Sequence, residues 1–229
     1  MPIYHVHIRK TGGTSINHAI ISELTSEDDE EVVNRMRDSN LQQVISEGRV
    51  FAGWSKRIIN HGTFNFAFSH TPIERLTLSK DTFIFTCLRH PIDRLYSHYK
   101  MLKGYLANDV DKPCVIFEGP WAKGSFTEFL QKASKEAREN QLYMFSTMYD
   151  VEDALQNIRR CDMILMFDRL GDDIKKLSES LNLNLKLPYK NRSMSDDIIS
   201  EEEKEMVKEL LKDELDFYNT VRSEIYKSD

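Results

Sequence analysis

The sequence predicts an α/β fold in which helices flank a central, mainly parallel sheet. Two observations support this class. Short apolar segments alternate with segments of helical periodicity along the 229 residues. One segment, Phe83–Cys87, is almost continuously apolar, as is typical of a strand that is buried on both faces of a parallel sheet. It leads into Pro91, which suits the first turn of a helix.

The same patterns predict the remaining elements. Strands are expected at 3–8, 49–53, 64–70 and 162–168, and helices at 16–24, 26–46, 91–102, 125–135, 152–160, 170–183 and 200–226. Gly48 would end the second helix, and the last range holds one helix or two. Residues 104–124 are predicted to form a long loop of the kind that often covers a site. We expect a single domain over 1–229, with inserts at 25–60 and 104–124.

Composition narrows the possible functions. The 31 basic and 37 acidic residues give a net charge of −6, so overall charge argues against a nucleic-acid-binding protein. The three cysteines form no CxxC pair, which argues against a zinc or redox motif. No apolar run is long enough to cross a membrane, and no signal peptide is visible. Unless the chain is a trimmed form of a longer protein, these observations favour a cytoplasmic protein without membrane contact.

The segment VHIRKTGGTS near the start of the chain has the composition of an anion-binding loop. Glycines allow backbone N–H groups to turn inward, and the helix that follows adds unpaired N–H donors. The residues expected to contact an anion are Lys10, Thr11, Gly12, Gly13, Thr14 and Ser15. The alternative is a tight strand-to-helix turn with a hydroxyl cap. The lysine precedes the glycines, so the segment is not a Walker A loop, and the magnesium of that motif is not implied.

A second basic segment, CLRHPIDRLYSHY, follows the most apolar strand. Arg89 lies at the end of this strand, and Arg94 and Ser97 lie on the predicted helix. An arginine at a strand end and a serine on the next helix can hold one phosphate from two sides. Arg94 can serve the same anion, or form a salt bridge to Asp93 or to a neighbouring element. The alternative is a pair of surface arginines.

Together the two segments resemble the sulfotransferases, in particular the carbohydrate branch that includes heparan sulfate 2-O-sulfotransferase. That family has motifs similar to K-T-x-x-T-S and R-x-P-x-x-R-x-x-S, which match here from Lys10 to Ser15 and from Arg89 to Ser97. The resemblance implies a P-loop-kinase-like layered fold and the sulfate donor 3′-phosphoadenosine-5′-phosphosulfate (PAPS), with PAP as product. The first motif would hold the 5′-phosphosulfate and the second the 3′-phosphate. Arg9 and His90 depart from the usual proline and aspartate.

Sulfuryl transfer needs a base for the acceptor hydroxyl and a cation at the leaving oxygen, while a metal is not expected. Lys10 is the expected cation. His70 follows a predicted strand, as does the catalytic histidine of the resembled branch, and is the expected base. Glu74 or His98 can assist it. The histidines His5 and His7 have a spacing that could bind a metal, but packing in the core is the favoured interpretation.

A third basic segment, at Lys190 and Arg192, resembles the family's C-terminal contact with the 3′-phosphate, and an exposed turn is the alternative. The sequence therefore predicts a PAPS-dependent sulfotransferase acting on a hydroxyl, with a saccharide as the favoured acceptor. A P-loop kinase or hydrolase, and a catalytically silent nucleotide- or glycan-binding protein, are the alternatives. The oligomeric state is left open.

Overall fold

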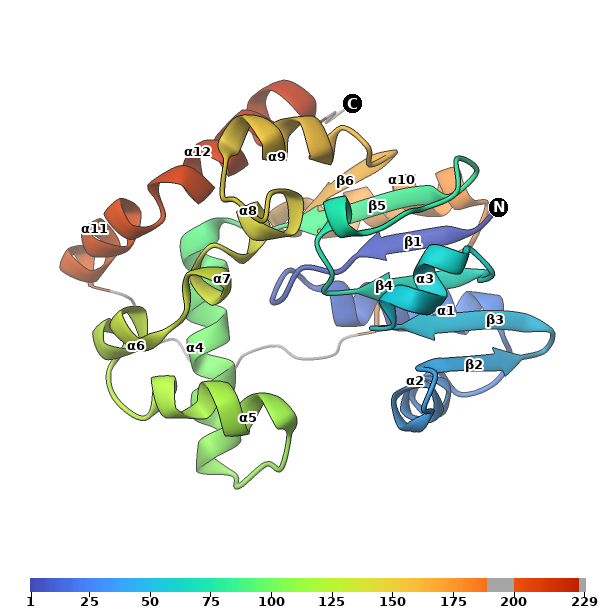
Figure 1. The fold of residues 1–229 in the computed structure, drawn as a ribbon, viewed down its shortest axis with the longest axis horizontal. Helices are drawn as coiled ribbons and strands as arrows, with labels where there is room; N and C mark the ends of the chain where they lie inside the picture. Colours follow the sequence, from blue (N-terminus) through green and yellow to red (C-terminus); the bar gives the residue numbers. More distant parts are fainter. Residues whose placement is uncertain (189–199, 227–229) are drawn as a thin grey trace.

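The structure is a computed structural model that describes residues 1–188 and 200–226. In this part of the chain, six strands form one sheet in the order β2-β3-β4-β1-β5-β6 (Figure 1). The strands are β1 (Ile3–Val6), β2 (Gln43–Ser46), β3 (Arg49–Gly53), β4 (Phe66–Ser69), β5 (Phe83–Leu88) and β6 (Met163–Met166). Neighbouring strands are parallel except β2 and β3. The predicted α/β class with a mainly parallel sheet is confirmed.

Helices follow most of the strands. The α-helices are α1 (Gly13–Leu24), α2 (Asp29–Asp38), α3 (Lys56–His61), α4 (Pro91–Ala107), α5 (Pro113–Glu118), α6 (Phe126–Lys132), α7 (Lys135–Arg138), α8 (Asn140–Phe145), α9 (Val151–Ile158), α10 (Leu170–Leu181), α11 (Glu201–Leu210) and α12 (Lys212–Thr220). Short 3-10 turns lie at Ile73–Arg75, Gly119–Ala122 and Phe167–Arg169, and a π turn at Val221–Ile225. Among the described helices, none has the length and apolar character needed to cross a membrane.

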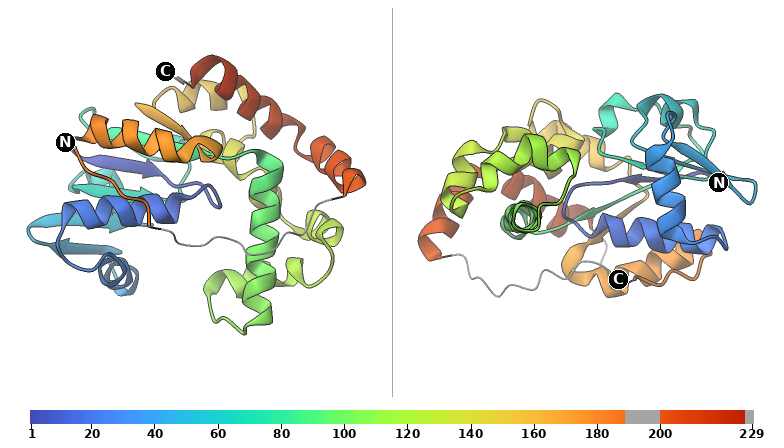
Figure 2. Two further views of the ribbon diagram at one scale, coloured as in Figure 1. Left: turned by 180° about the vertical axis from the view of Figure 1, so that it is seen from behind. Right: turned by 90° about the horizontal axis from the view of Figure 1, so that it is seen from below.

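The two faces of the sheet are covered by different helices. On one face α1, α2 and α10 pack on the sheet through a core that includes Ile16, Phe66 and Phe85. On the other face α3, α8, α9 and α12 pack through a core that includes Tyr4 and Phe145. Figure 2 shows α1 and α10 together on the face that is turned away in Figure 1. Burial of both faces explains why most residues of the central strands are apolar.

A third apolar core lies beyond one end of the sheet, where α4, α6 and α11 lie in Figure 1. Leu95 and Leu102 of α4 pack there with Phe129 of α6 and Leu211, which follows α11. This layer is built on α4, which begins immediately after β5. It therefore extends from the same edge of the sheet at which we expected the anion site.

The helix predicted over 26–46 is shorter than expected. It ends at Asp38, and the rest of the range forms β2 in an antiparallel hairpin with β3. The turn residues Glu47 and Gly48 both have positive φ, 48° and 76°. Such a two-residue turn joins antiparallel strands without a break in their twist. Gly48 is therefore a hairpin residue rather than the end of a helix.

The loop predicted over 104–124 is mostly helical. α4 continues to Ala107, Pro113 begins α5, and a 3-10 turn follows from Gly119. Proline at the first position of a helix leaves no unsatisfied N–H, which explains why a Pro-containing segment can start one. The helix predicted from residue 125 begins here as α6, and Ser125 and Glu128 form a capping box at its start.

Three neighbouring strands bring the predicted site segments to one edge of the sheet. β4, β1 and β5 are adjacent and parallel, and Val6 is in register with Ser69 on one side and Thr86 on the other. The loop containing Lys10, the residue His70 and the residue Arg89 each follow one of these strands. Ligands of open parallel sheets bind at this edge.

Candidate functional site

The loop between β1 and α1 is a tight left-handed turn. Lys10 and Gly12 have φ values of 68° and 86°, and α1 begins at Gly13. The Thr11 hydroxyl donates a hydrogen bond to the carbonyl oxygen of Ile8 at 3.0 Å, which closes the turn. The N-terminus of α1 has no side-chain cap from Gly12. The first N–H groups of α1 are therefore oriented as an anion site requires.

The two glycines are required by close packing. A Cβ atom on Gly13 would lie 2.2 Å from Cδ2 of His7, and one on Gly12 would lie 3.1 Å from the Phe167 ring. Any side chain at Gly13 would displace either the loop or the histidine ring beneath it. Of the two hydroxyl residues that follow, Thr14 is exposed and Ser15 is half-buried in the first turn of α1.

Arg89 lies directly against this loop. Its Nη1 donates to the carbonyl oxygen of Lys10 at 3.3 Å, and its guanidinium lies 4.3 Å from the centre of the Phe167 ring. Its backbone N–H donates to Oε1 of Gln141 at 2.8 Å. The two predicted anion-binding segments are thus brought together, as the motif pair indicated.

Burial lowers the pKa of both cations, and the charge of Arg89 adds to its effect on Lys10. Burial, followed by the nearby Arg89 charge, lowers the pKa of Lys10 to about 8. Burial likewise lowers the pKa of Arg89. Because a bound anion would offset both costs, this pair favours a ligand with negative charge.

Arg94 does not lie where the motif suggested. Its side chain is 0% exposed, and its Nε is 3.4 Å from Oε1 of Glu214 on α12. Its Nη2 donates to the backbone carbonyls of Ala137 and Arg138. The helical periodicity of α4 turns this position into the protein, so Arg94 joins α4, α7 and α12 instead of facing the loop. Ser97 is half-buried on α4.

His70 has a fixed orientation at the end of β4. Its Nδ1 lies 2.6 Å from the carbonyl oxygen of His7. Because a carbonyl oxygen only accepts, Nδ1 carries the proton, and Nε2 of the neutral ring is left with the basic lone pair. Burial and the Arg9 charge lower the pKa of His70 to about 4, so the ring is neutral at neutral pH.

The histidines at the end of β1 are packed in the interior. His5 donates through Nδ1 to Oδ1 of Asn17 at 2.6 Å, and Asn17 donates through Nδ2 to Nδ1 of His7 at 3.3 Å. The His7 ring also contacts the His70 ring, with 4.6 Å between their centres. The favoured interpretation, core packing with hydrogen bonds, is confirmed for this pair.

The two candidates for assisting His70 are used elsewhere. His98 is completely buried and donates through Nε2 to Oε2 of Glu118 at 2.8 Å. Glu74 accepts hydrogen bonds from the backbone N–H and the hydroxyl of Thr147. Neither side chain contacts His70. The predicted phosphate contacts Lys190 and Arg192 lie outside the described residues.

Sequence reasoning missed several residues around the loop. Glu118 accepts a hydrogen bond from Nη1 of Arg9, and Oδ1 of Asn140 accepts one from the Arg9 backbone N–H at 3.2 Å. Gln141 supports Arg89 and also donates to Glu214 at 3.1 Å. The only signal in the sequence was Arg9, which replaces the usual proline of the family motif.

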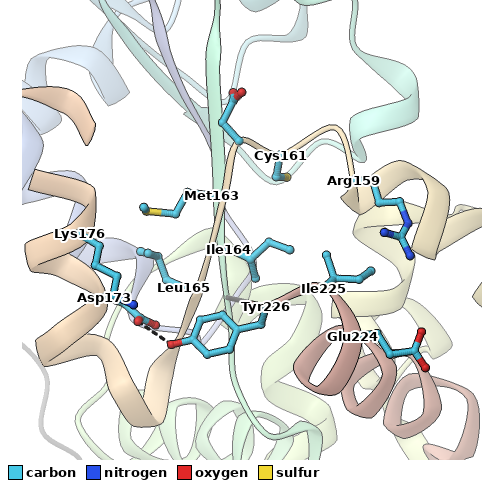
Figure 3. A pocket seen from close by; sticks show the side chains of 11 residues that line it. Arg159, Cys161, Met163, Ile164, Leu165, Asp173, Lys176, Glu224, Ile225 and Tyr226 are labelled. Carbon is cyan, nitrogen blue, oxygen red and sulfur yellow. Dashed lines mark hydrogen bonds between the residues drawn. The ribbon is translucent and has the colours of Figure 1, made fainter. Parts of the chain in front are cut away.

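A cavity of about 460 Å³ lies away from these residues, along the outer edge of β6 (Figure 3). Tyr226 closes part of it, since its hydroxyl donates to Oδ1 of Asp173 at 2.6 Å. Of the residues predicted for donor binding or catalysis, those that the structure describes do not line this cavity. The predicted residues Lys10, His70 and Arg89 lie instead at the edge formed by β4, β1 and β5.

Comparison with known proteins shows the family to which the chain belongs. Residues 2–229 match the sulfotransferase family, so the chain belongs to that family. The predicted enzyme class, a sulfotransferase with PAPS as donor and PAP as product, is confirmed. No curated protein matches the sequence significantly.

Two solved structures are similar in outline. Mouse sulfotransferase SULT7A1, complexed with PAP, is 12% identical; 96% of this chain and 86% of that chain are covered, with a TM-score of 0.49. A sulfotransferase from Alicyclobacillus acidocaldarius is 15% identical; 96% of this chain and 95% of that chain are covered, with a TM-score of 0.46.

Proposed function

We propose that this sulfotransferase transfers the sulfuryl group of PAPS to a hydroxyl of a carbohydrate. The observation that carries the proposal is the meeting of Lys10, Arg89 and His70 at the ends of three adjacent strands. This arrangement supports a cationic donor site beside a neutral imidazole. The acceptor class is supported by the resemblance of the motifs, including the position of His70, to the carbohydrate branch.

In this proposal the donor spans two groups of residues. Lys10 and the turn residues Gly12 to Ser15 hold the 5′-phosphosulfate, while Arg89 and Ser97 hold the 3′-phosphate. Thr11 contributes its backbone N–H, because its hydroxyl is bonded to Ile8. Arg94 is left out of the donor site, because its guanidinium is enclosed by protein.

The proposed chemistry is an in-line displacement at sulfur. The acceptor oxygen forms a bond to sulfur while its proton passes to Nε2 of His70. The bond between sulfur and the 5′-phosphate oxygen breaks, and the electron pair stays on that oxygen as PAP leaves. Lys10 would stabilise the negative charge that develops there. The products are a sulfate ester, PAP and a protonated His70, which then releases its proton to solvent.

The test is to incubate the protein with labelled PAPS and a panel of saccharides. Label in one saccharide, with an equal amount of PAP released, is expected. His70→Ala should lower turnover about 10²- to 10⁴-fold, the range attributed to a general base. His61→Ala, on the exposed end of α3, is the control and should leave turnover near that of the unmodified protein.

Other outcomes would refute parts of the proposal. No binding of PAP by calorimetry would remove the donor site. Binding of PAP without transfer to any acceptor would favour a silent binding protein. Magnesium-dependent hydrolysis of ATP would favour the P-loop kinase or hydrolase alternative.

A further inference from the structure

Glu118 joins three segments next to the proposed site. It is the last residue of α5 and is buried. One carboxylate oxygen accepts from Nη1 of Arg9 in the loop after β1, and the other accepts from Nε2 of His98 on α4 at 2.8 Å. In the described part of the chain, Nδ1 of His98 has no hydrogen-bond partner, so this carboxylate is the polar contact of that buried ring.

Glu118 is held as a carboxylate. Burial would raise its pKa, but the hydrogen bonds and charges of His98 and Arg9 outweigh burial and lower the pKa to about 2. The side chain of Arg9 is 36% exposed, so this guanidinium is fixed at the border between protein and solvent. The negative charge of Glu118 is thus present at neutral pH.

This ion pair begins two residues beyond the point at which the loop holds His70: the carbonyl oxygen of His7 accepts from Nδ1 of His70 at 2.6 Å, and Arg9 carries the pair with Glu118. The charged and titratable groups around the His70 ring are His5 and His7 from the β1 side, Arg9 from the loop, and Glu118 from α5. Arg9 disfavours a proton on His70, whereas Glu118 favours one.

We propose that Glu118 is a positioning residue for sulfuryl transfer, which holds Arg9 beside His70 and offsets its charge there. The proposal rests on the proposed role of His70 as base. During transfer the imidazole gains positive charge, so a free arginine at this place would oppose the reaction. With Glu118 paired to it, the arginine keeps its place on the loop while its effect on the imidazolium is reduced. The pair would replace the rigidity that a proline gives to this position in the resembled family.

Opposite charge changes provide the test. His70 is titrated by NMR in the protein without donor or acceptor. Glu118→Gln keeps the shape of the side chain and should lower the midpoint of His70 by about one unit, while Arg9→Gln should raise it by about one unit. The double variant Arg9→Gln/Glu118→Gln is the matched control, and its His70 midpoint should lie near that of the unmodified protein.

Kinetics give a second readout. Glu118→Gln should lower kcat about threefold to tenfold and leave the KM for PAPS within about twofold, because the base and not the donor site is affected. Glu118→Asp should recover part of this loss.

A purely structural role would reduce activity in both single variants without opposite shifts of the midpoint. Shifts in the same direction, or no shift in either variant, would overturn the proposal. If Glu118→Gln does not fold, Arg9→Gln and the double variant still test the proposal. The titration midpoint of His70 must then be higher in Arg9→Gln than in the double variant. Opposite shifts in a protein that transfers no sulfuryl group would refute the proposed function and not the charge relation.

Discussion

Arg89 and Arg94 belong to one sequence motif, yet the fold uses them in different ways. Arg89 follows β5, is half-buried, and lies against the backbone of Lys10. Arg94, one turn into α4, is completely buried and faces Glu214. The first is next to a loop that can receive an anion, and the second is enclosed by its own protein partners.

The difference shows that motif spacing alone does not assign a role. A residue at a strand end faces the edge of the sheet whatever the helix does next. A residue inside the helix faces wherever the helical period places it, and α4 packs Arg94 against α7 and α12. Gln141 connects the two arginines, since it accepts from the Arg89 backbone and donates to Glu214.

Replacing each arginine by methionine should separate the two roles most strongly. Arg94→Met leaves the Glu214 carboxylate buried without its cation, so the free energy of unfolding should fall by about 3–5 kcal/mol. Urea denaturation measures this loss. Arg89→Met is the matched variant: it should change stability little and weaken PAP binding by about 1.5–3 kcal/mol in calorimetry, the value of hydrogen bonds to a charged group.

The same experiment can contradict the different roles assigned to Arg89 and Arg94. If Arg94→Met were stable but no longer bound PAP, Arg94 would be an anion ligand and the buried contacts with Glu214 would be incidental. The double variant Arg94→Met/Glu214→Leu provides a further check. It should be more stable than Arg94→Met, because no unpaired carboxylate is left in the interior.

Lys10 is expected to matter more for turnover than for donor binding. Lys10→Ala should lower kcat about 10²- to 10³-fold, as does loss of one group that stabilises charge in a transition state. Its effect on the affinity for PAPS should be smaller, because in the intact donor the bridging oxygen carries little of the negative charge that develops on it during transfer. Lys112 is exposed, and its charge also lowers the pKa of Lys10. Lys112→Ala is therefore the control for loss of a nearby positive charge. Equal losses of turnover and affinity in Lys10→Ala would make the lysine an anchor only.

The sequence predicted the sheet and its functional edge well, because both depend on local patterns. Apolar runs locate β1, β4 and β5, and parallel pairing brings their ends together. The exceptions have physical causes. The β2–β3 hairpin was missed because Gly48 suits a helix end and a two-residue turn equally well. The segment before Gly124 was misjudged because proline can start a helix as well as prevent one.

Long-range contacts explain what was missed in the site. Nothing near His70 in the sequence indicates that the carbonyl oxygen of His7 fixes its tautomer. Likewise, Glu118 lies 109 positions from Arg9, and only the fold brings the two together. Lys10 and Arg89 could be proposed from the sequence because each lies beside a glycine turn or a strand end, where residue type and local structure agree.

The burial of Lys10 predicts a measurable proton uptake when PAP binds. In the free protein the pKa of Lys10 is lowered to about 8 by burial and then by Arg89, so part of the lysine is neutral just above neutral pH. A bound anion favours the ammonium form, so its pKa rises and a proton is taken up. PAP affinity should therefore be highest below about pH 8 and fall as pH rises, by at most about tenfold per unit for one proton. Calorimetry in buffers of different ionisation enthalpy measures the uptake directly. Lys10→Arg, which stays charged throughout, should bind PAP without it, and an uptake of equal size in that variant would assign the proton to another group.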